Sequence, residues 1–174
     1  MSDTCMKTTT GKIVDLASFD LSILDVKDIE TSLNMTYRFN GHFMNDAPPL
    51  TVAQHSLLCY DLAYSQHPKE NFLHLCCFTH DFAEAYTGDL SSPMKKLLGD
   101  AWQEAVGPIE EQIESIFNGP RSIPNDVRDE VKRIDHEALV LEQRVQEYPK
   151  QLRDFVPLGK IWNGLYELAY NMEK

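Results

Sequence analysis

The segment at residues 80–95, HDFAEAYTGDLSSPMK, carries four side chains that are suited to catalysis. His80 and Asp81 are adjacent. Glu84 follows about one helical turn later, and Asp89 lies in the turn that ends the predicted helix. An imidazole and a carboxylate are good ligands for divalent metal ions, whereas additional carboxylates can transfer protons. The segment therefore indicates metal-assisted hydrolysis of a phosphoester, provided that other parts of the chain complete the ligand set.

His55 and Asp135 are the candidate ligands outside this segment. The helix face that carries His55 is otherwise apolar and includes Val52, Cys59 and Leu62. His80 shares a face with Leu73 and with Cys76 or Cys77. Asp135 is one position from the centre of an apolar stripe formed by Val127, Val131, Ile134, Ala138, Leu141 and Val145. Residues three and four apart share a helix face, so all three side chains are predicted to point into one core.

Each of these residues also has a purely structural interpretation. A single inward-facing histidine such as His55 is more often a hydrogen-bonded core residue than a ligand. Asp135 can instead cap a helix or form an ion pair with Arg133 or Arg144. A shared metal explains them together, because an unpaired buried carboxylate is costly. We therefore predict that helices of one bundle hold a divalent ion through His55, His80, Asp81 and Asp135.

The composition is that of a single domain, residues 1–174, with a net charge of −11. This charge argues against binding to nucleic-acid polymers or anionic membranes, but a metal ion and a few basic residues allow a free nucleotide to bind. The four cysteines lack zinc-finger spacing, the N-terminal residues lack the apolar core of a signal peptide, and no apolar run approaches a membrane span. The expectation is a reduced, cytoplasmic protein.

Helical patterns fill most of the chain and predict an all-α bundle of about seven helices. The segments with this pattern are residues 25–36, 51–65, 70–85, 91–98, 100–117, 122 or 124 to 148, and 158–172. Residues 1–24 are predicted to be irregular, with a short β-prone patch at Ile13 and Val14. Residues 37–49 are predicted to form a loop, because they are rich in Gly, Asn and Pro.

Four stretches of the chain resemble the HD-domain metal-dependent phosphohydrolases. They are IETSLNMTYRFNGHF at residues 29–43, VAQHS at 52–56, HDFAEAYTGDLSSPMK at 80–95 and VKRIDHEALVLE at 131–142. The resemblance runs from about residue 8 to residue 145. It is closest to the small deoxynucleotide 5′-phosphatases and to the phage deoxyadenosine triphosphate triphosphohydrolases, and it implies a helical HD-domain fold.

The resemblance implies a role for each residue of these motifs. The metal ligands of the H…HD…D set are His55, His80, Asp81 and Asp135. The catalytic carboxylates are Glu84 and Asp89. Arg38 is expected to contact the substrate phosphate, and Phe39 is expected to lie near the sugar. The 5′-phosphatases carry Trp at the position of Phe39.

Three further residues are predicted substrate contacts, each with a structural alternative. Lys95 and Lys96 can neutralise phosphate charge together with Arg38, although a lysine on a helix is more often a solvated charge. His42 can bind phosphate or a second ion, or it can stabilise its own loop.

The expected function is hydrolysis of deoxynucleotides to a deoxynucleoside and phosphate or polyphosphate, most specifically as a phage-type dATP triphosphohydrolase. One alternative is a deoxynucleoside 5′-monophosphatase. Others are a (p)ppGpp hydrolase and an inactive nucleotide-binding HD domain. Zn, Co, Mn, Ni, Fe or Mg can serve as the divalent ion. The expected partner is a small-molecule nucleotide, and the family suggests a homo-oligomer, either a dimer or a hexameric ring.

Overall fold

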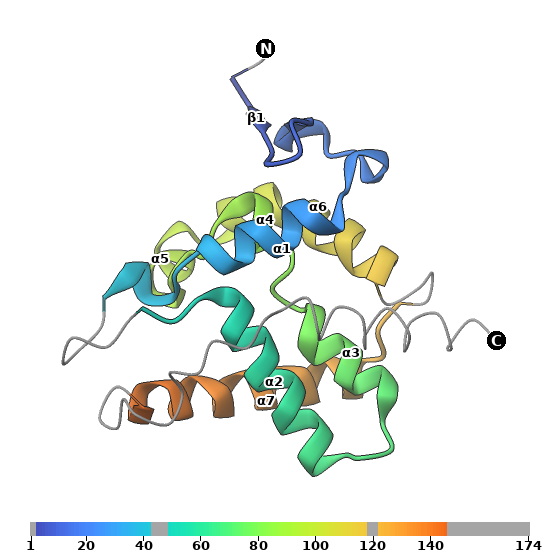
Figure 1. Ribbon diagram of the computed structural model, residues 1–174, viewed down its shortest axis with the longest axis vertical. Helices are drawn as coiled ribbons and strands as arrows, with labels where there is room; N and C mark the ends of the chain where they lie inside the picture. The colour runs from blue at the N-terminus through green and yellow to red at the C-terminus, as the bar shows by residue number, and fades with distance from the viewer. Residues whose placement is uncertain (1–2, 43–48, 118–121, 146–174) are drawn as a thin grey trace.

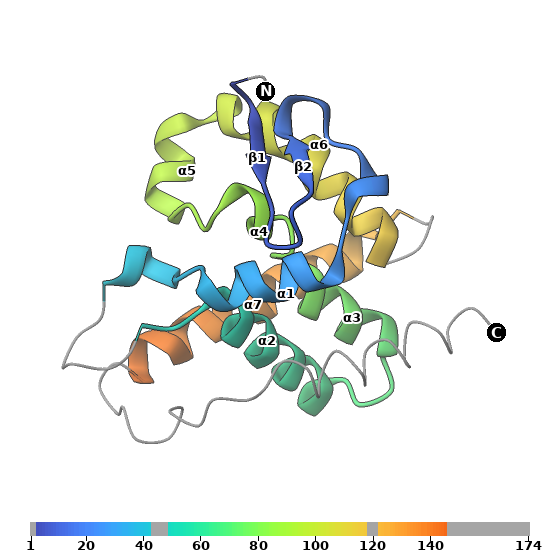
Figure 2. The ribbon, with the colours of Figure 1, turned by 45° about the horizontal axis from the view of Figure 1, so that its top comes forward.

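The computed structural model describes residues 3–42, 49–117 and 122–145, which are mostly helical (Figure 1, Figure 2). These residues form the α-helices α1 Val26–Met35, α2 Val52–Gln66, α3 Asn71–Thr79, α4 Glu84–Thr87, α5 Ser92–Leu98, α6 Asp100–Phe117 and α7 Asn125–Val145. The remaining elements are an antiparallel hairpin of β1 Cys5–Lys7 and β2 Ile13–Asp15 and the 3₁₀ turns η1 Leu16–Ser18, η2 Leu21–Ile23 and η3 Arg38–Gly41. The prediction of an all-α bundle is confirmed, and the β-prone patch lies in β2.

The structure differs from the prediction over residues 70–85, where two helices replace one. After α3 ends, the amides of Phe82 and Glu84 donate to the carbonyls of Thr79 and Asp81, both at 3.0 Å. These bonds span three residues rather than four and tighten the backbone into a turn. The break places the His-Asp pair in that turn rather than in the middle of a helix. The predicted helix at residues 158–172 lies outside the described residues.

The helices α2, α3 and α7 pack against one another and form one half of the molecule (Figure 1). Helix α1 packs on both α2 and α4 and so links this half to the hairpin, α5 and α6 (Figure 2). The segments that carry the predicted ligands therefore meet where α2, α3 and α7 come together. This arrangement follows from the amphipathic patterns, because each helix buries one apolar face against its neighbours.

The start of α2 is fixed to the segment that carries Arg38. Thr51 and Gln54 form a capping box, in which the Thr51 hydroxyl accepts from the Gln54 amide and the Gln54 side chain accepts from the Thr51 amide. The amide of Arg38 donates to the Leu50 carbonyl at 2.8 Å, and the amide of Val52 donates to the Thr36 carbonyl at 2.9 Å. These bonds hold Arg38 beside the first turn of α2.

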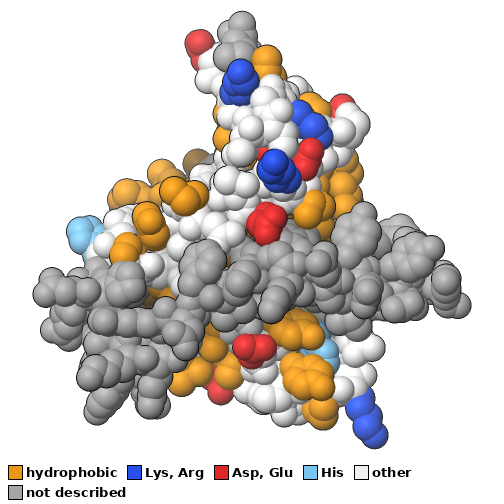
Figure 3. All heavy atoms as spheres, viewed as in Figure 1, with side chains coloured by type: hydrophobic (Ala, Val, Ile, Leu, Met, Phe, Trp, Pro, Cys, Tyr) orange, Lys and Arg blue, Asp and Glu red, His pale blue; other side chains and the backbone are white. Residues whose placement is uncertain are grey.

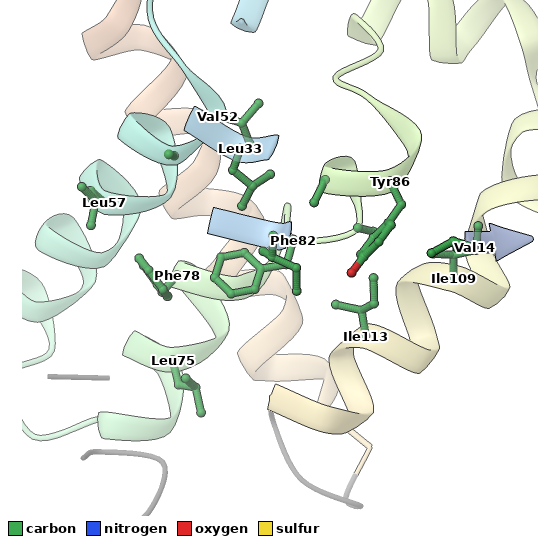
Figure 4. Packing of buried hydrophobic residues seen from close by; sticks show 14 residues of the cluster. Val14, Leu33, Val52, Leu57, Leu75, Phe78, Phe82, Tyr86, Ile109 and Ile113 are labelled. Carbon is green, nitrogen blue, oxygen red and sulfur yellow. The ribbon is translucent and has the colours of Figure 1, made fainter. Parts of the chain in front are cut away.

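Two apolar clusters hold the helices together. The larger one joins the hairpin with α1, α2, α3, α4 and α6, and Phe78 and Phe82 lie edge to face within it at 5.1 Å between ring centroids (Figure 4). Because Phe82 directly follows Asp81, its burial anchors the turn that carries the His-Asp pair. The smaller cluster lies between α2, α3 and α7 and consists of Cys59, Ala63, Leu73, Cys77, Ile134 and Ala138.

Large apolar side chains are exposed on and near α5. On the face shown in Figure 3, apolar side chains gather toward the end of the molecule where α5 and η3 lie. Leu97 is 80% exposed, and Met94, Leu98 and Met35 are also exposed. An exposed apolar group of this kind is typical of a protein contact surface. The expected homo-oligomer stays a prediction.

Cys59 and Cys77 are buried free thiols. Within residues 3–42, 49–117 and 122–145, none of the helices combines the length and the apolar character needed to cross a bilayer.

Asp28 fastens the hairpin segment to α1. Its buried carboxylate accepts from the Thr10 amide at 2.7 Å and from the Thr10 hydroxyl at 2.6 Å. Burial acts to raise the pKa of Asp28, but the hydrogen bonds from Thr10 outweigh it and hold the pKa below the ordinary value. A lowered pKa stabilises the folded state above the pKa of the unfolded chain, and this stabilisation is lost as the pH falls through the folded pKa.

We expect Asp28→Asn to lower the free energy of unfolding at pH 7 by about 1–3 kcal/mol, the usual cost of losing a buried hydrogen bond to a charged group. The difference from the wild type should shrink below a pH of about 4, where the carboxylate of the unfolded chain takes up a proton. Urea unfolding at both pH values, with a chelator present, measures this difference. Asp129→Asn, at an exposed position of α7, is the control. An equal loss at both pH values would contradict the prediction.

Candidate metal centre

Three elements bring nitrogen and oxygen atoms together at one point. His55 comes from α2, His80 from the turn after α3, and Asp135 from α7. The two Nε2 atoms are 3.3 Å apart. Asp135 Oδ1 lies 3.0 Å from His55 Nε2 and 3.8 Å from His80 Nε2. Asp81 Oδ2 lies 3.5 Å and 3.3 Å from the same two nitrogens. The structure thus brings together all four residues that the sequence predicted as ligands.

The tautomers of the two histidines are fixed by the other ring nitrogens. His80 Nδ1 lies 2.8 Å from the Cys77 carbonyl oxygen, which can only accept, so Nδ1 carries the proton. His55 Nδ1 lies 2.7 Å from Glu142 Oε1 and is also the donor. In the neutral rings, both Nε2 atoms therefore direct lone pairs toward each other and toward the Asp135 carboxylate. Such an arrangement is repulsive unless a proton or a metal cation lies between the atoms.

The separations between these atoms fit a divalent metal ion. Four ligands at about 2.0–2.3 Å from a tetrahedral ion lie roughly 3.3–3.8 Å apart. The distances of 3.0 to 3.8 Å among His55, His80 and Asp135 scatter around this value. Asp135 is not the ion-pair partner of Arg133, because Arg133 pairs with Glu130 and Glu137. The donor set fits a metal ion better than it fits ordinary core packing.

The charges at the site favour a bound cation. Burial acts to raise the pKa of Asp81, but the neighbouring His80, His55 and Arg38 lower it below the ordinary value. Burial also acts to raise the pKa of Asp135, but its contacts with His55 and His80 lower it. Burial acts to lower the pKa of His80, whereas the two carboxylates raise it to about 9. Both carboxylates are therefore ionised at neutral pH.

The centre is sealed on one side and open on the other. The His55 side chain is 0% exposed, whereas the Asp135 side chain is 44% exposed. Structural zinc sites are closed, but catalytic sites keep one position accessible to water or substrate. The exposed edge at Asp135 leaves the centre accessible to water on that side.

Glu142 is a buried residue of the site that the sequence analysis did not identify. It lies seven residues, or about two helical turns, after Asp135 on α7. Its Oε1 accepts from His55 Nδ1 at 2.7 Å, and its Oε2 accepts from Arg38 Nε at 3.1 Å. The signal that could have identified Glu142 in the sequence is its position as a charged residue on the inward face of α7. Glu142 orients a predicted metal ligand, His55, and a predicted phosphate-binding residue, Arg38, at the same time.

Replacing Glu142 with Gln should weaken this connection without a large change of volume. An amide has one accepting oxygen, so its NH₂ group must face one of the two donors, His55 Nδ1 or Arg38 Nε. We expect metal affinity to fall by about 10- to 100-fold, as for other residues that orient a ligand. Metal titration against a competing chelator measures it. Glu137→Gln, on the more exposed side of α7, is the control and should leave the metal affinity unchanged. If Glu142→Gln also left the metal affinity unchanged, Glu142 would not orient His55 for metal binding.

Arg38 lies at the centre, as predicted for a phosphate ligand. Its NH1 is 3.5 Å from Asp81 Oδ2, and its side chain is mostly buried. Burial acts to lower the pKa of Arg38, but Glu142 and Asp81 raise it, so the guanidinium stays charged. The next two residues, Phe39 and Asn40, have φ values of 55° and 54°. This left-handed backbone is strained for residues other than glycine, and such strain is common at functional sites.

The predicted acid–base residues lie next to the centre. Glu84 is buried, and its Oε1 is 3.2 Å from Lys95 Nζ. Its Oε2 is buried and has no hydrogen-bond partner among the described residues. Burial and the charges of Asp81 and Asp89 raise the pKa of Glu84 well above the ordinary value. Asp89 is half-buried, and burial raises its pKa as well.

The remaining predicted contacts divide into two groups. Lys95 pairs with Glu84 and also lies 5.7 Å from the ring centroid of Trp102, so it is not a fully solvated charge. The Phe39 ring lies 5.5 Å from the Arg38 guanidinium carbon and is therefore next to the site. Lys96 and His42 are exposed, and their proposed substrate contacts stay predictions.

Two proteins are similar to this chain over most of its length. The chain is 30% identical over 139 residues to the uncharacterized protein YfdR of Escherichia coli, which covers 80% of this chain and 70% of that protein. It is 27% identical over 135 residues to the uncharacterized protein RCAP_rcc00048 of Rhodobacter capsulatus, which covers 76% of this chain and 68% of that protein. No family model matches the chain. Neither name states an activity.

Proposed function

This chain belongs to the same family as YfdR of Escherichia coli, and we propose that it is an HD-domain metal-dependent phosphohydrolase that acts on deoxynucleotides. The observation that carries the proposal is the pair of histidine Nε2 atoms that face each other at 3.3 Å. Both have their Nδ1 atoms engaged as donors, and the carboxylates of Asp81 and Asp135 lie beside them. A positively charged Arg38 next to this group supports a phosphate substrate.

The metal ligands in this proposal are His55, His80, Asp81 and Asp135. When bound, a divalent ion supplies a Lewis acid that polarises a phosphate oxygen. Arg38 binds the same phosphate, because its guanidinium stays charged and is held in place by Glu142. The open edge at Asp135 admits the substrate and water.

Glu84 and Asp89 have separate roles in proton transfer. Glu84 holds a proton at a higher pH than an ordinary glutamate, so it donates that proton to the leaving 5′ oxygen. Lys95 orients Glu84 through the contact with Oε1 and leaves Oε2 for the transfer. Asp89 is less buried than Glu84 and accepts a proton from the attacking water. Separate environments for two carboxylates are typical of paired acid and base roles.

The substrate in this proposal is a deoxyadenosine nucleotide, with dATP slightly ahead of dAMP. The preference for adenine rests on the resemblance of the RFNGH segment to phage triphosphohydrolases. The preference for deoxyribose rests on Phe39, whose ring lies next to Arg38 and leaves a 2′ hydroxyl without a hydrogen-bond partner. A small nucleotide is the partner, and a dimer or a ring is the proposed assembly.

A product screen tests the proposal. The purified chain is incubated with Zn²⁺, Co²⁺ or Mn²⁺ and with dATP, dAMP, dGTP, ATP or ppGpp, and the products are separated. We expect the fastest turnover with dATP and release of deoxyadenosine with triphosphate. Equal rates for ATP and dATP would contradict the sugar preference, and faster dAMP hydrolysis would favour a 5′-monophosphatase. Turnover of ppGpp alone would support an alarmone hydrolase, and no turnover with any metal would support a nucleotide-binding domain without activity.

A further inference from the structure

Cys59 lies in the metal centre, one helical turn after His55 on α2. Its Sγ is 3.5 Å from His55 Nε2. Cys59 Sγ and the ligand atoms of His55, His80 and Asp135 all lie within 4.8 Å of one another. Cys59 is buried, and it belongs to the apolar cluster between α2, α3 and α7. In the HD-domain resemblance this position has no role.

We propose that Cys59 is a direct ligand of the metal and that its thiolate makes the centre select Zn²⁺ or Co²⁺ over Mg²⁺ and Mn²⁺. The inference rests on the proposed metal centre and extends it to the identity of the ion. Thiolate ligands favour softer ions, whereas carboxylates and water suit Mg²⁺ and Mn²⁺.

The distances around Cys59 fit a ligand. In a tetrahedral site with a metal–sulfur distance of about 2.3 Å and a metal–nitrogen distance of about 2.0–2.1 Å, the sulfur lies roughly 3.5 Å from the nitrogen. The observed distance from Cys59 Sγ to His55 Nε2 is 3.5 Å. The spacing of four residues between the two places both on the same face of α2. Cys59 therefore lies within reach of an ion held by His55, His80 and Asp135.

The charge balance also allows this ligand. Binding releases the thiol proton to solvent, because a coordinating cysteine binds as the thiolate. The cation then offsets the thiolate and the carboxylate of Asp135. Asp81 lies 3.5 Å from Arg38 NH1 as well as near the two histidines, so its charge is also offset by the guanidinium. With Cys59 included, the chain offers five donors, one more than a tetrahedral ion takes. The four whose ligand atoms all lie within 4.8 Å of one another are His55, Cys59, His80 and Asp135, and Asp81 is the donor that Arg38 also neutralises.

Cobalt substitution distinguishes a thiolate ligand from a site made only of nitrogen and oxygen. A bound thiolate gives Co²⁺ an intense near-ultraviolet charge-transfer absorption that imidazole and carboxylate ligands do not give. We expect this band in the wild-type chain loaded with one equivalent of Co²⁺, and we expect its loss in Cys59→Ser. Cys77→Ser is the matched control, because Cys77 is a buried cysteine of the same apolar cluster. It should keep the band.

Zinc affinity gives a second readout that does not depend on activity. In Cys59→Ser, the affinity for Zn²⁺ should fall by at least about 10- to 100-fold, the loss seen when even an outer partner of a ligand is removed. The affinity for Mn²⁺ should change much less. Cys59→Ala is compared alongside, and circular dichroism confirms that each variant is folded.

The outcomes separate the two proposals. A wild-type chain that binds Co²⁺ without the near-ultraviolet band would overturn the role of Cys59 and leave the metal centre intact. A band that persists in a folded Cys59→Ser or Cys59→Ala variant would do the same. A wild-type chain that binds neither Co²⁺ nor Zn²⁺ would overturn the proposed metal-dependent function together with the role of Cys59.

Discussion

Replacement of His80 with alanine is expected to abolish metal binding and phosphate release together. His80 Nε2 is one of the two nitrogens that face each other at 3.3 Å, and its ring is held by the bond from Nδ1 to the Cys77 carbonyl. Without this ring the centre loses an inner ligand, and the negative charge of Asp81 and Asp135 is left less compensated. Asp81→Ala should have the same effect on metal and turnover, because it removes the other half of the pair.

The loss of metal should also lower the thermal stability of the variant under conditions in which the wild type is loaded. The ligands come from α2, α7 and the turn after α3, so a bound ion ties three segments together. Anything that binds only the folded state stabilises it by an amount that grows with the logarithm of ligand concentration over Kd. Addition of Zn²⁺ should therefore raise the Tm of the wild type and leave that of His80→Ala unchanged.

His67→Ala is the control for this experiment. His67 is a histidine at the end of α2 that pairs with Glu130 through Nε2 at 2.7 Å. It is not one of the residues at the metal centre, so its replacement should keep both the metal and the turnover. Metal content is measured by mass spectrometry after dialysis, and phosphate release is measured on the same samples. Stoichiometric metal with normal turnover in His80→Ala would refute the ligand assignment.

The helical architecture could be predicted from sequence because most helices have an amphipathic pattern. Helix α6 occupies residues 100–117 as predicted, and Thr51, the first residue of the predicted segment 51–65, is the N-cap of α2. The turn at residues 80–83 could not be predicted, because the apolar pattern continues through it. What breaks the helix there is a change to hydrogen bonds three residues apart. That change is set by the packing of the turn rather than by local propensity.

The residues of the candidate site could also be predicted only in part. The convergence of His55, His80 and Asp135 was predicted from their positions on the apolar faces of separate predicted helices, although His80 lies in the turn after α3. Glu142 was missed because its role depends on contacts with two distant residues, His55 and Arg38. Cys59 was interpreted as an apolar residue, because a buried cysteine usually packs like a small hydrophobe. Only the position of its sulfur beside a ligand nitrogen indicates another role.

Glu84→Gln is expected to retain the metal and to lose most of the turnover. Glutamine has nearly the same shape, and its oxygen can still accept from Lys95 Nζ, but it cannot give up a proton to the leaving oxygen. Loss of a general acid typically lowers the rate by about 100- to 10,000-fold. The comparison is made from kcat in the metal-loaded enzyme. Glu110→Gln is the control, because Glu110 is a half-buried glutamate on α6 whose pKa burial also raises.

The rate should depend on pH through the protonation of Glu84, and this dependence gives the prediction a second test. Burial raises the pKa of Glu84, so the folded state holds this proton to a higher pH than the unfolded chain. The rate of the wild type should therefore fall as the pH rises through the folded pKa, and this limb should be absent from the residual activity of Glu84→Gln. The substitution should affect stability in the opposite direction to the rate. A group with a raised carboxyl pKa destabilises the folded state once the pH exceeds the unfolded pKa, so Glu84→Gln should unfold at a higher temperature than the wild type at pH 8. Unchanged turnover, or a lower Tm at that pH, would show that Glu84 is an ordinary ionised partner of Lys95.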